Sequence, residues 1–232
     1  PNPTLVSIVD TEGWTEHVTM VSGHAFVSDY RGGVLIFDLT DPASPVAVAN
    51  LGFDDKKFGA ALEIAVVLGA ANGNDYAYVA SDLGLRIIDV TIPSQAFIVA
   101  ELDTDVDNGL IPQGIVVDRG IAYLSSWTGG LLVIDVGNPS APLLSQSIAT
   151  DYAFYKLVVD PTADLLYVAE GTKGIRVLDI ANAGSFAGVV TDDQIDIGKF
   201  VWDIGRANGE LFVGFGDLDD LSGGFQTIID RF

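Results

Sequence analysis

Residues 129–142 read GGLLVIDVGNPSAP, and imperfect copies of this stretch recur along the chain. Each copy is a glycine followed by a mostly apolar run that ends on an aspartate. The other copies are GVLIFDLTDPASP at 33–45, GLRIIDV at 84–90, GIRVLDI at 174–180 and GFQTIID at 224–230. The aspartates lie at positions 38, 89, 135, 179 and 230, between 44 and 51 residues apart. A period of this length is typical of four-stranded propeller blades.

Each repeat contains four short strand patterns. The first is apolar, as in residues 64–67, and the second is rich in aromatic and small residues, as in residues 122–125. The third is the apolar run before the aspartate, and the fourth follows a turn, as in residues 97–100. A strand that is apolar at nearly every position is buried on both faces. Blades that pack face to face provide that burial.

The fifth repeat stops at Phe232 and lacks a fourth strand, whereas residues 4–9, TLVSIV, form a strand pattern that belongs to no repeat. An unpaired strand edge is costly, so we expect residues 4–9 to pair with the strand around residues 225–229. The prediction is an all-β fold in one domain, residues 1–232. It is a five-bladed β-propeller with four antiparallel strands per blade, closed into a ring by the N-terminal strand joining the C-terminal blade.

The repeat resembles that of a known family. Leu132-Val133-Ile134-Asp135, Leu35-Ile36-Phe37-Asp38 and the turn at 41–45, DPASP, resemble the LVIVD-repeat family of bacterial and archaeal β-propeller proteins. The resemblance covers nearly the whole chain, although the copies after residues 174 and 224 lack the Pro-x-x-Pro turn. It implies a propeller in a surface or secreted protein, and so an extracellular or cell-surface location. It implies no single activity, because propellers host many.

The charge of the chain restricts its partners. It has 11 Lys and Arg against 32 Asp and Glu, which gives a net charge of −21. Such a surface repels nucleic acids and anionic membranes. No apolar run approaches the roughly 20 residues that span a bilayer, so we expect no membrane insertion. Divalent cations, basic proteins and neutral sugars remain open as partners, and so does an acidic surface that serves only solubility.

Carboxylates suggest one metal site. Asp103, Asp105 and Asp107 alternate in a loop that ends on Asn108-Gly109 and can direct several oxygens at one calcium ion. The spacing is not that of an EF-hand, since Gly114 stands where the closing glutamate would be, and a solvated acidic loop is the alternative. Residues 216–220, GDLDD, are a weaker candidate. The repeated aspartates are better explained as turn residues that bond to nearby backbone N–H groups. No organic cofactor is implied.

Polar residues interrupt the innermost strands at matching positions of the repeat. In a propeller these strands line the central channel, so we expect a polar channel that binds a ligand or supports acid–base chemistry. Paired charges in a water-filled channel are the alternative. The predicted channel residues are Glu16, His17, Glu63, Gln113, Tyr155, Lys156, Trp202 and Asp203.

Aromatic residues occupy loops that we expect at the mouth of this channel. Such side chains stack on sugar rings, anchor a protein partner, or pack between blades. The residues at the mouth are Trp14, Tyr30, Trp127 and Tyr152, with Phe154 close by.

The sequence favours an extracytoplasmic propeller that acts as a binding module for a glycan or protein partner, stabilised by calcium. One alternative is a channel-based enzyme such as a glycan-acting hydrolase or lyase, with Glu16, Glu63 and Asp203 as its carboxylates. Another is a structural spacer in a larger surface protein. Whether the chain is an enzyme stays open at this point.

Overall fold

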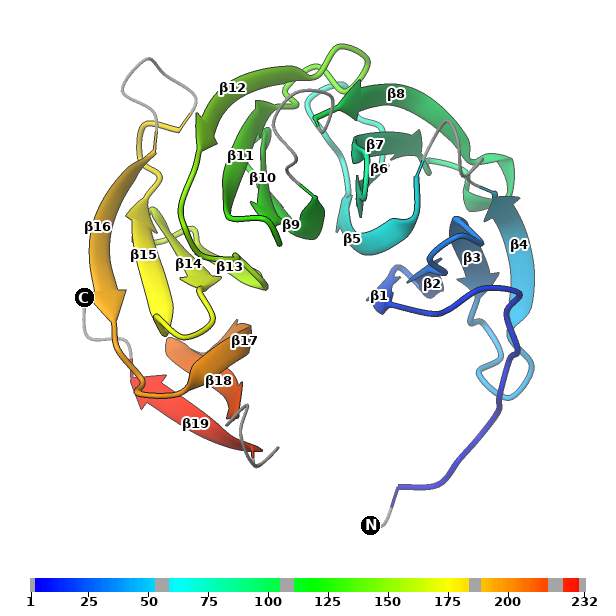
Figure 1. The fold of residues 1–232 in the computed structure, drawn as a ribbon. Helices are drawn as coiled ribbons and strands as arrows, with labels where there is room; N and C mark the ends of the chain where they lie inside the picture. Colours follow the sequence, from blue (N-terminus) through cyan, green and yellow to red (C-terminus); the bar gives the residue numbers. More distant parts are fainter. Residues whose placement is uncertain (1–2, 53–58, 105–110, 184–188, 217–222, 230–232) are drawn as a thin grey trace. The chain divides into compact units, whose positions relative to one another are not determined.

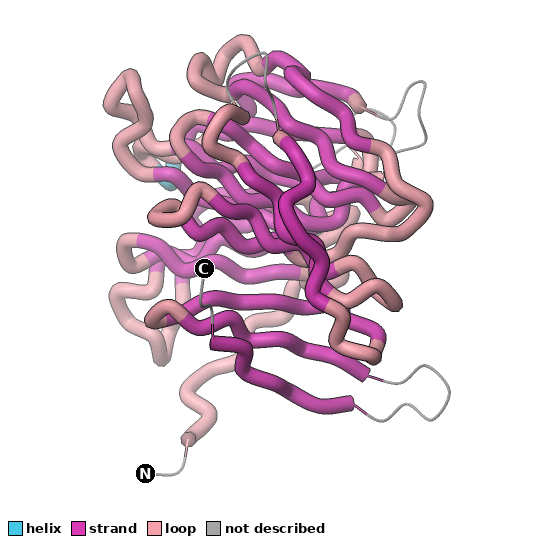
Figure 2. The backbone as a smooth tube through the Cα atoms, turned by 90° about the vertical axis from the view of Figure 1, so that its left-hand side faces the viewer, coloured by secondary structure: helices cyan, strands magenta, loops and turns pink. Residues whose placement is uncertain are grey.

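The computed structural model describes residues 3–52, 59–104, 111–183, 189–216 and 223–229, and the chain divides into two compact units, Pro1–Val106 and Asp107–Phe232. The backbone is almost all strand and turn, with one 3-10 turn (Figure 2). No described helix is long and apolar enough to cross a membrane. Each unit is considered by itself, and a single domain spanning residues 1–232 stays a prediction.

The first unit consists of two four-stranded antiparallel sheets, drawn in blue to green in Figure 1. Both follow the order of the chain, so that each strand pairs with the next. The strands of the first sheet are β1 (His17–Val21), β2 (His24–Ser28), β3 (Val34–Asp38) and β4 (Val46–Leu51). Those of the second are β5 (Ala61–Val67), β6 (Tyr76–Ser81), β7 (Gly84–Asp89) and β8 (Phe97–Asp103), with the 3-10 turn η1 (Pro93–Gln95) before β8.

The second unit has two sheets of four strands and one of three among the described residues. The first contains β9 (Pro112–Asp118), β10 (Ile121–Ser126), β11 (Gly130–Asp135) and β12 (Leu143–Ile148). The next contains β13 (Leu157–Asp160), β14 (Leu165–Ala169), β15 (Ile175–Asp179) and β16 (Val190–Ile195). The last contains β17 (Phe200–Ala207), β18 (Glu210–Gly216) and β19 (Gly223–Ile229).

The third strand of each four-stranded sheet is buried, as its apolar sequence predicts. Every residue of β3, β7 and β11 before the terminal aspartate is buried. Neighbouring sheets within a unit share one apolar cluster. Ile36 and Ile64 belong to such a cluster in the first unit, and Tyr123 and Leu166 to another in the second. Apolar area removed from water stabilises a fold by roughly 25 cal/mol per Å², so these sheet-to-sheet contacts are the main source of stability.

The aspartates of the repeat cap turns, as the sequence indicates. In four repeats the carboxylate accepts a hydrogen bond from the backbone N–H two residues later, and this bond ends the third strand. The pairs are Asp38 with Thr40 at 2.7 Å, Asp89 with Thr91 at 2.9 Å, Asp135 with Gly137 at 2.9 Å and Asp179 with Ala181 at 2.8 Å. At Asp38, the bonds from Thr40 lower the pKa of the carboxyl. The fifth aspartate, Asp230, lies outside the described residues.

A β-bulge recurs beside these aspartates. The pairing of the third strand with the fourth shifts register one residue before the aspartate in all four four-stranded sheets. The shifts fall between Ile36 and Phe37, Ile87 and Ile88, Val133 and Ile134, and Val177 and Leu178. A bulge bends the strand and increases its twist.

The expected strand at residues 4–9 is wrong. This segment forms no strand, and the last sheet has three strands among the described residues. Leu5 and Ile8 are more than three-quarters exposed, and Ser7 donates a hydrogen bond to the carbonyl of Pro42. The first sheet already has four strands without the segment. Pairing with residues 225–229 would join the two units, and ring closure stays a prediction.

In both sheets of the first unit, an aspartate directly after the second strand binds the segment that precedes the first strand. Asp29 is almost fully buried and accepts hydrogen bonds from Thr11 Oγ1 at 2.6 Å and from the N–H of Gly13 at 2.8 Å. Asp82, after β6, accepts one from the N–H of Ala60 at 2.6 Å. A carboxylate suits this role because it has acceptor sites for several donors.

We expect Asp29→Ala to lower the free energy of unfolding by about 3 kcal/mol, because Thr11 and Gly13 lose a buried carboxylate as their acceptor. Asp41→Ala is the matched control. Asp41 accepts a single bond, from Ala43, in an exposed turn, and its loss should cost less than about 1 kcal/mol. Urea unfolding measures both. Equal losses in the two variants would show that Asp29 does not hold residues 11–15 in place.

Candidate functional site: an aromatic row in the second unit

Four aromatic rings form a continuous row across the three sheets of the second unit. Trp127 follows β10, Tyr155 precedes β13, and Phe200 and Trp202 belong to β17. Successive ring centroids are 5.3, 5.4 and 6.0 Å apart, and the first two pairs meet edge to face. The tryptophans at the two ends are 53% and 43% exposed. The row therefore presents an indole at each end and is supported by its inner rings.

Local backbone geometry fixes Trp127. Its N–H bonds to the carbonyl of Ile111, and the turn closes with a bond from Gly129 to Ser126. Gly129 has φ of +106°, and a Cβ there would lie 2.3 Å from the carbonyl oxygen of Thr150. Only glycine fits this position.

Contacts between neighbouring sheets fix Tyr155. The Ser125 hydroxyl donates a short hydrogen bond to the carbonyl of Tyr155, and the N–H of Tyr155 bonds to Ala169. Burial raises the pKa of the Tyr155 phenol, which therefore stays protonated at neutral pH. The equivalent bond in the first unit runs from Ser28 to the carbonyl of Leu62 at 2.7 Å.

A charged pair accompanies the row. Lys156 follows Tyr155 and Asp203 follows Trp202, and the two charges interact. Burial lowers the pKa of the Lys156 ammonium, and the carboxylate of Asp203 raises it to a lesser extent. Two predicted channel residues from different sheets thus lie within electrostatic reach of each other. Gln113, in β9, is partly exposed.

The first unit brings together two more predicted channel residues. The Nε2 atom of His17, in β1, lies 3.6 Å from Oε1 of Glu63, in β5. Glu63 is buried, whereas the neighbouring Glu16 is exposed and its N–H bonds to Ser28. Residues of the two units are not placed relative to each other, so a channel lined by all eight predicted residues stays a prediction.

The aromatic residues predicted at the channel mouth have different environments. Trp14 is 78% exposed, and the guanidinium of Arg31 lies 5.8 Å from the Tyr30 ring. Tyr152 is 40% exposed, with Lys173 Nζ 4.7 Å from its ring centre. Phe154 is fully buried in the core and does not belong to a mouth. Sequence reasoning missed Phe200, although Phe200 and Trp202 have the spacing of two residues on one face of a strand.

The predicted metal loop is described only in part. Asp105 and Asp107 lie outside the described residues, as do Asp217, Asp219 and Asp220 of the weaker candidate. The carboxylate of Asp103 is 2.7 Å from the guanidinium of Arg86, a fully buried side chain in β7. Across the ranges that the structure describes, no three potential ligands gather as a metal site requires. Calcium binding stays a prediction, and Asp103 already has a cationic partner.

We expect Asp103→Ala to lower the free energy of unfolding by about 1–3 kcal/mol, because a buried guanidinium loses its carboxylate. The loss should be the same in calcium chloride and in a chelator, as measured by thermal melting at constant ionic strength. A loss that appears only with calcium would instead identify Asp103 as a metal ligand.

We expect Lys156→Met to stabilise the protein at pH 7 relative to the parent. A lysine whose pKa is lower in the folded state than in the unfolded state destabilises the fold while it is charged. This cost disappears as the pH rises through the folded pKa toward the unfolded value of about 10.4. The difference in melting temperature between the two proteins should therefore shrink from pH 7 to pH 10. A less stable variant at pH 7, or a difference independent of pH, would contradict this.

Comparison with known protein families identifies three of these repeats. The family model described as LVIVD repeat matches residues 12–51, 70–104 and 112–150. No curated protein sequence matches the chain. Among solved structures, a protein from Bacteroides fragilis whose description names 6-phosphogluconolactonase as a candidate activity is 14% identical, with a TM-score of 0.64. A protein from Lactobacillus plantarum is 13% identical, also with a TM-score of 0.64.

The computationally designed Ika8 protein is also similar, with 8% identity and a TM-score of 0.60. The three alignments cover 94%, 91% and 90% of this chain for the designed, Bacteroides and Lactobacillus proteins. The chain spans 62% of the length of the designed protein and 68% of each of the other two. At such low identity the likeness shows the fold alone.

Proposed function

Because the chain is an LVIVD-repeat protein with propeller-like sheets, we propose that it is a binding module and that the aromatic row of its second unit recognises a neutral glycan. The observation that carries the proposal is the row itself. Trp127 and Trp202 are large apolar side chains that stay 53% and 43% exposed, whereas Tyr155 and Phe200 between them are partly buried. Exposed aromatic rings on a rigid scaffold are typical of recognition surfaces.

Geometry and charge together favour sugars. The ring hydrogens of a pyranose pack on an aromatic face, while its hydroxyl groups need nearby donors and acceptors. Lys156 and Asp203 follow two rings of the row and provide both kinds of group. The net charge of −21 repels anionic polysaccharides, so the proposal is restricted to neutral ones.

The wider setting is also part of the proposal. Five sheets of similar topology are consistent with the five blades of one propeller. The resemblance to LVIVD proteins supports an extracellular or cell-surface location, where neutral glycans are abundant. A protein partner is the second candidate ligand, since tryptophans are frequent anchors of protein interfaces.

An enzymatic function has less support. A glycosidase needs two carboxyl groups about 5–10 Å apart across one bond of the substrate. Glu16 and Glu63 belong to the first unit and Asp203 to the second, and the side chain of Glu63 lies against His17. The candidate lactonase activity named for the Bacteroides protein would also require a catalytic group. Turnover of a bound sugar would nevertheless favour this alternative.

The three tryptophans of the chain allow an internal control. Titration with a panel of neutral oligosaccharides should change tryptophan fluorescence with saturation. Trp127→Ala or Trp202→Ala should weaken binding at least about tenfold, which corresponds to about 1.4 kcal/mol. Trp14→Ala, in the first unit, should leave the affinity unchanged. If no sugar of the panel binds, or if Trp14→Ala weakens binding as much as the other two, the row is not a glycan site.

A further inference from the structure

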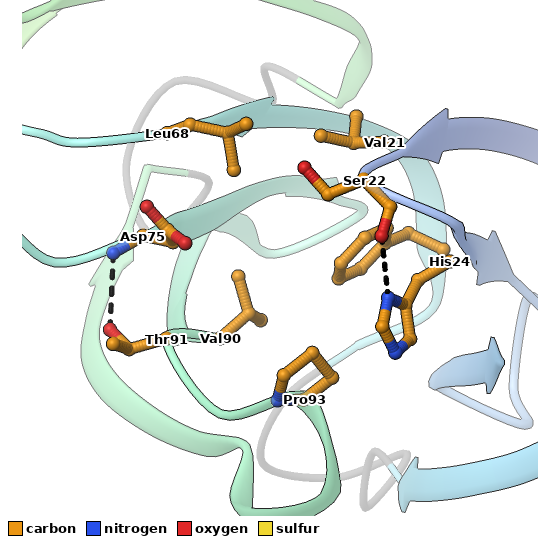
Figure 3. A pocket seen from close by; sticks show the side chains of 9 residues that line it. Val21, Ser22, His24, Leu68, Asp75, Val90, Thr91 and Pro93 are labelled. Atoms are coloured by element: carbon orange, nitrogen blue, oxygen red, sulfur yellow. Dashed lines mark hydrogen bonds between the residues drawn. The ribbon is translucent and has the colours of Figure 1, made fainter.

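A second cavity lies in the first unit, apart from the aromatic row. It has a volume of about 160 Å³ and lies where the β1–β2 turn faces the loop after β5 and the turn after β7. Figure 3 shows its nine lining side chains, with Asp75 and His24 on opposite sides. Apolar side chains form most of the wall, among them Val21, Leu68 and Val90. A cavity of this size accommodates a molecule with a single six-membered ring.

Backbone contacts hold Asp75 in a fixed position. Its Oδ1 accepts a hydrogen bond from the N–H of Gly69 at 2.7 Å, and its own N–H donates to Thr91 Oγ1 at 3.1 Å. Its carbonyl accepts a bond from the N–H of Val90. One N–H occupies only part of the acceptor capacity of a carboxylate, which can receive about four hydrogen bonds. Asp75 is therefore a pre-positioned acceptor at the wall of an apolar cavity.

His24 lies on the other side of the cavity. Its Nδ1 lies 3.1 Å from the carbonyl oxygen of Ser22. A carbonyl oxygen only accepts, so Nδ1 carries a proton and donates this hydrogen bond. Ser22 and Gly23 have φ of +50° and +76°, which makes the β1–β2 connection a tight hairpin and holds His24 beside the cavity.

The surrounding charge is negative. Asp89 accepts a bond from the N–H of Thr91, and Asp38 interacts electrostatically with His24. The nine lining residues include no lysine or arginine. A ligand for this cavity therefore needs an apolar body, hydrogen-bond donors and a positive charge.

We propose that this cavity binds a small amine, with its ammonium group at Asp75 and a single ring or short alkyl body against Val21, Leu68 and Val90. The ammonium donates to the carboxylate, and the apolar body replaces water along the wall. The site is independent of the aromatic row, so each of the two proposals can fail without the other.

Benzylamine is the probe, and backbone amide chemical shifts of the isotope-labelled protein are the readout. Saturable shifts should appear at residues 21–24, 68–75 and 90–92. Asp75→Asn keeps an acceptor for the Gly69 N–H but removes the charge, and it should weaken binding about tenfold, as loss of a charge-assisted hydrogen bond does. Asp151→Asn makes the same charge change at an exposed position of the second unit and should leave the affinity unchanged.

Two further comparisons complete the test. Benzyl alcohol has the same ring without the charge, and it should bind the parent protein about tenfold more weakly than benzylamine does, a result that needs no variant to fold. Trp202→Ala should leave benzylamine binding intact, since Trp202 is not among the residues that line this cavity. The proposal is overturned if shifts outside these residues dominate, if benzyl alcohol binds equally well, or if Asp151→Asn weakens binding as much as Asp75→Asn.

Discussion

Face-to-face packing of sheets is the constraint on which the rest of this structure depends. The strand β15 contributes Leu178 to one apolar cluster and Val177 to another, so its sheet needs a neighbour on each face to remove that apolar surface from water. Directional bonds fix how the sheets of a unit meet. Gly171 and Val201 exchange two backbone hydrogen bonds between neighbouring sheets, and Ser28 reaches across to Leu62. Burial of apolar surface drives the stacking of the sheets, and these hydrogen bonds fix the position of each sheet against its neighbour.

The aromatic row follows from this packing. Tyr155 lies where one sheet begins, and its ring meets Trp127 from the preceding sheet and Phe200 from the following one. None of these rings would reach the others unless the sheets stacked in chain order. A rigid stack also restricts the rings before a ligand arrives, which reduces the entropy lost on binding. The proposed recognition surface thus follows from the same contacts that form the core.

The sequence predicts what depends on local pattern and fails where partners are distant. The strand positions within the repeats and the turn role of the repeated aspartates follow from periodicity and turn chemistry, and the structure confirms these strands and four of the five aspartates. For Phe154 the sequence left open a channel mouth or packing between blades, and the structure shows it buried in the core. The sequence also did not reveal that Asp103 pairs with Arg86, which is 17 positions away inside an apolar strand.

The candidate site, too, could be predicted from the sequence only in part. Trp127, Tyr155 and Trp202 were found from the alignment of repeats, but their mutual distances depend on how the sheets stack. Phe200 was missed because aromatic residues in strands are usually part of the core. The segment at residues 4–9 has the composition of a strand, but composition does not supply a partner with which to pair.

The recurring bulge has a consequence for the behaviour of the protein in solution. The fourth strand of each four-stranded sheet has a free edge, and a flat, regular edge would recruit strands from other molecules into intermolecular sheets. Each of these edge strands is irregular at the same place, so a second chain could not form an uninterrupted ladder along it. One extra residue in each fourth strand thereby interrupts the regular edge that an intermolecular sheet would need.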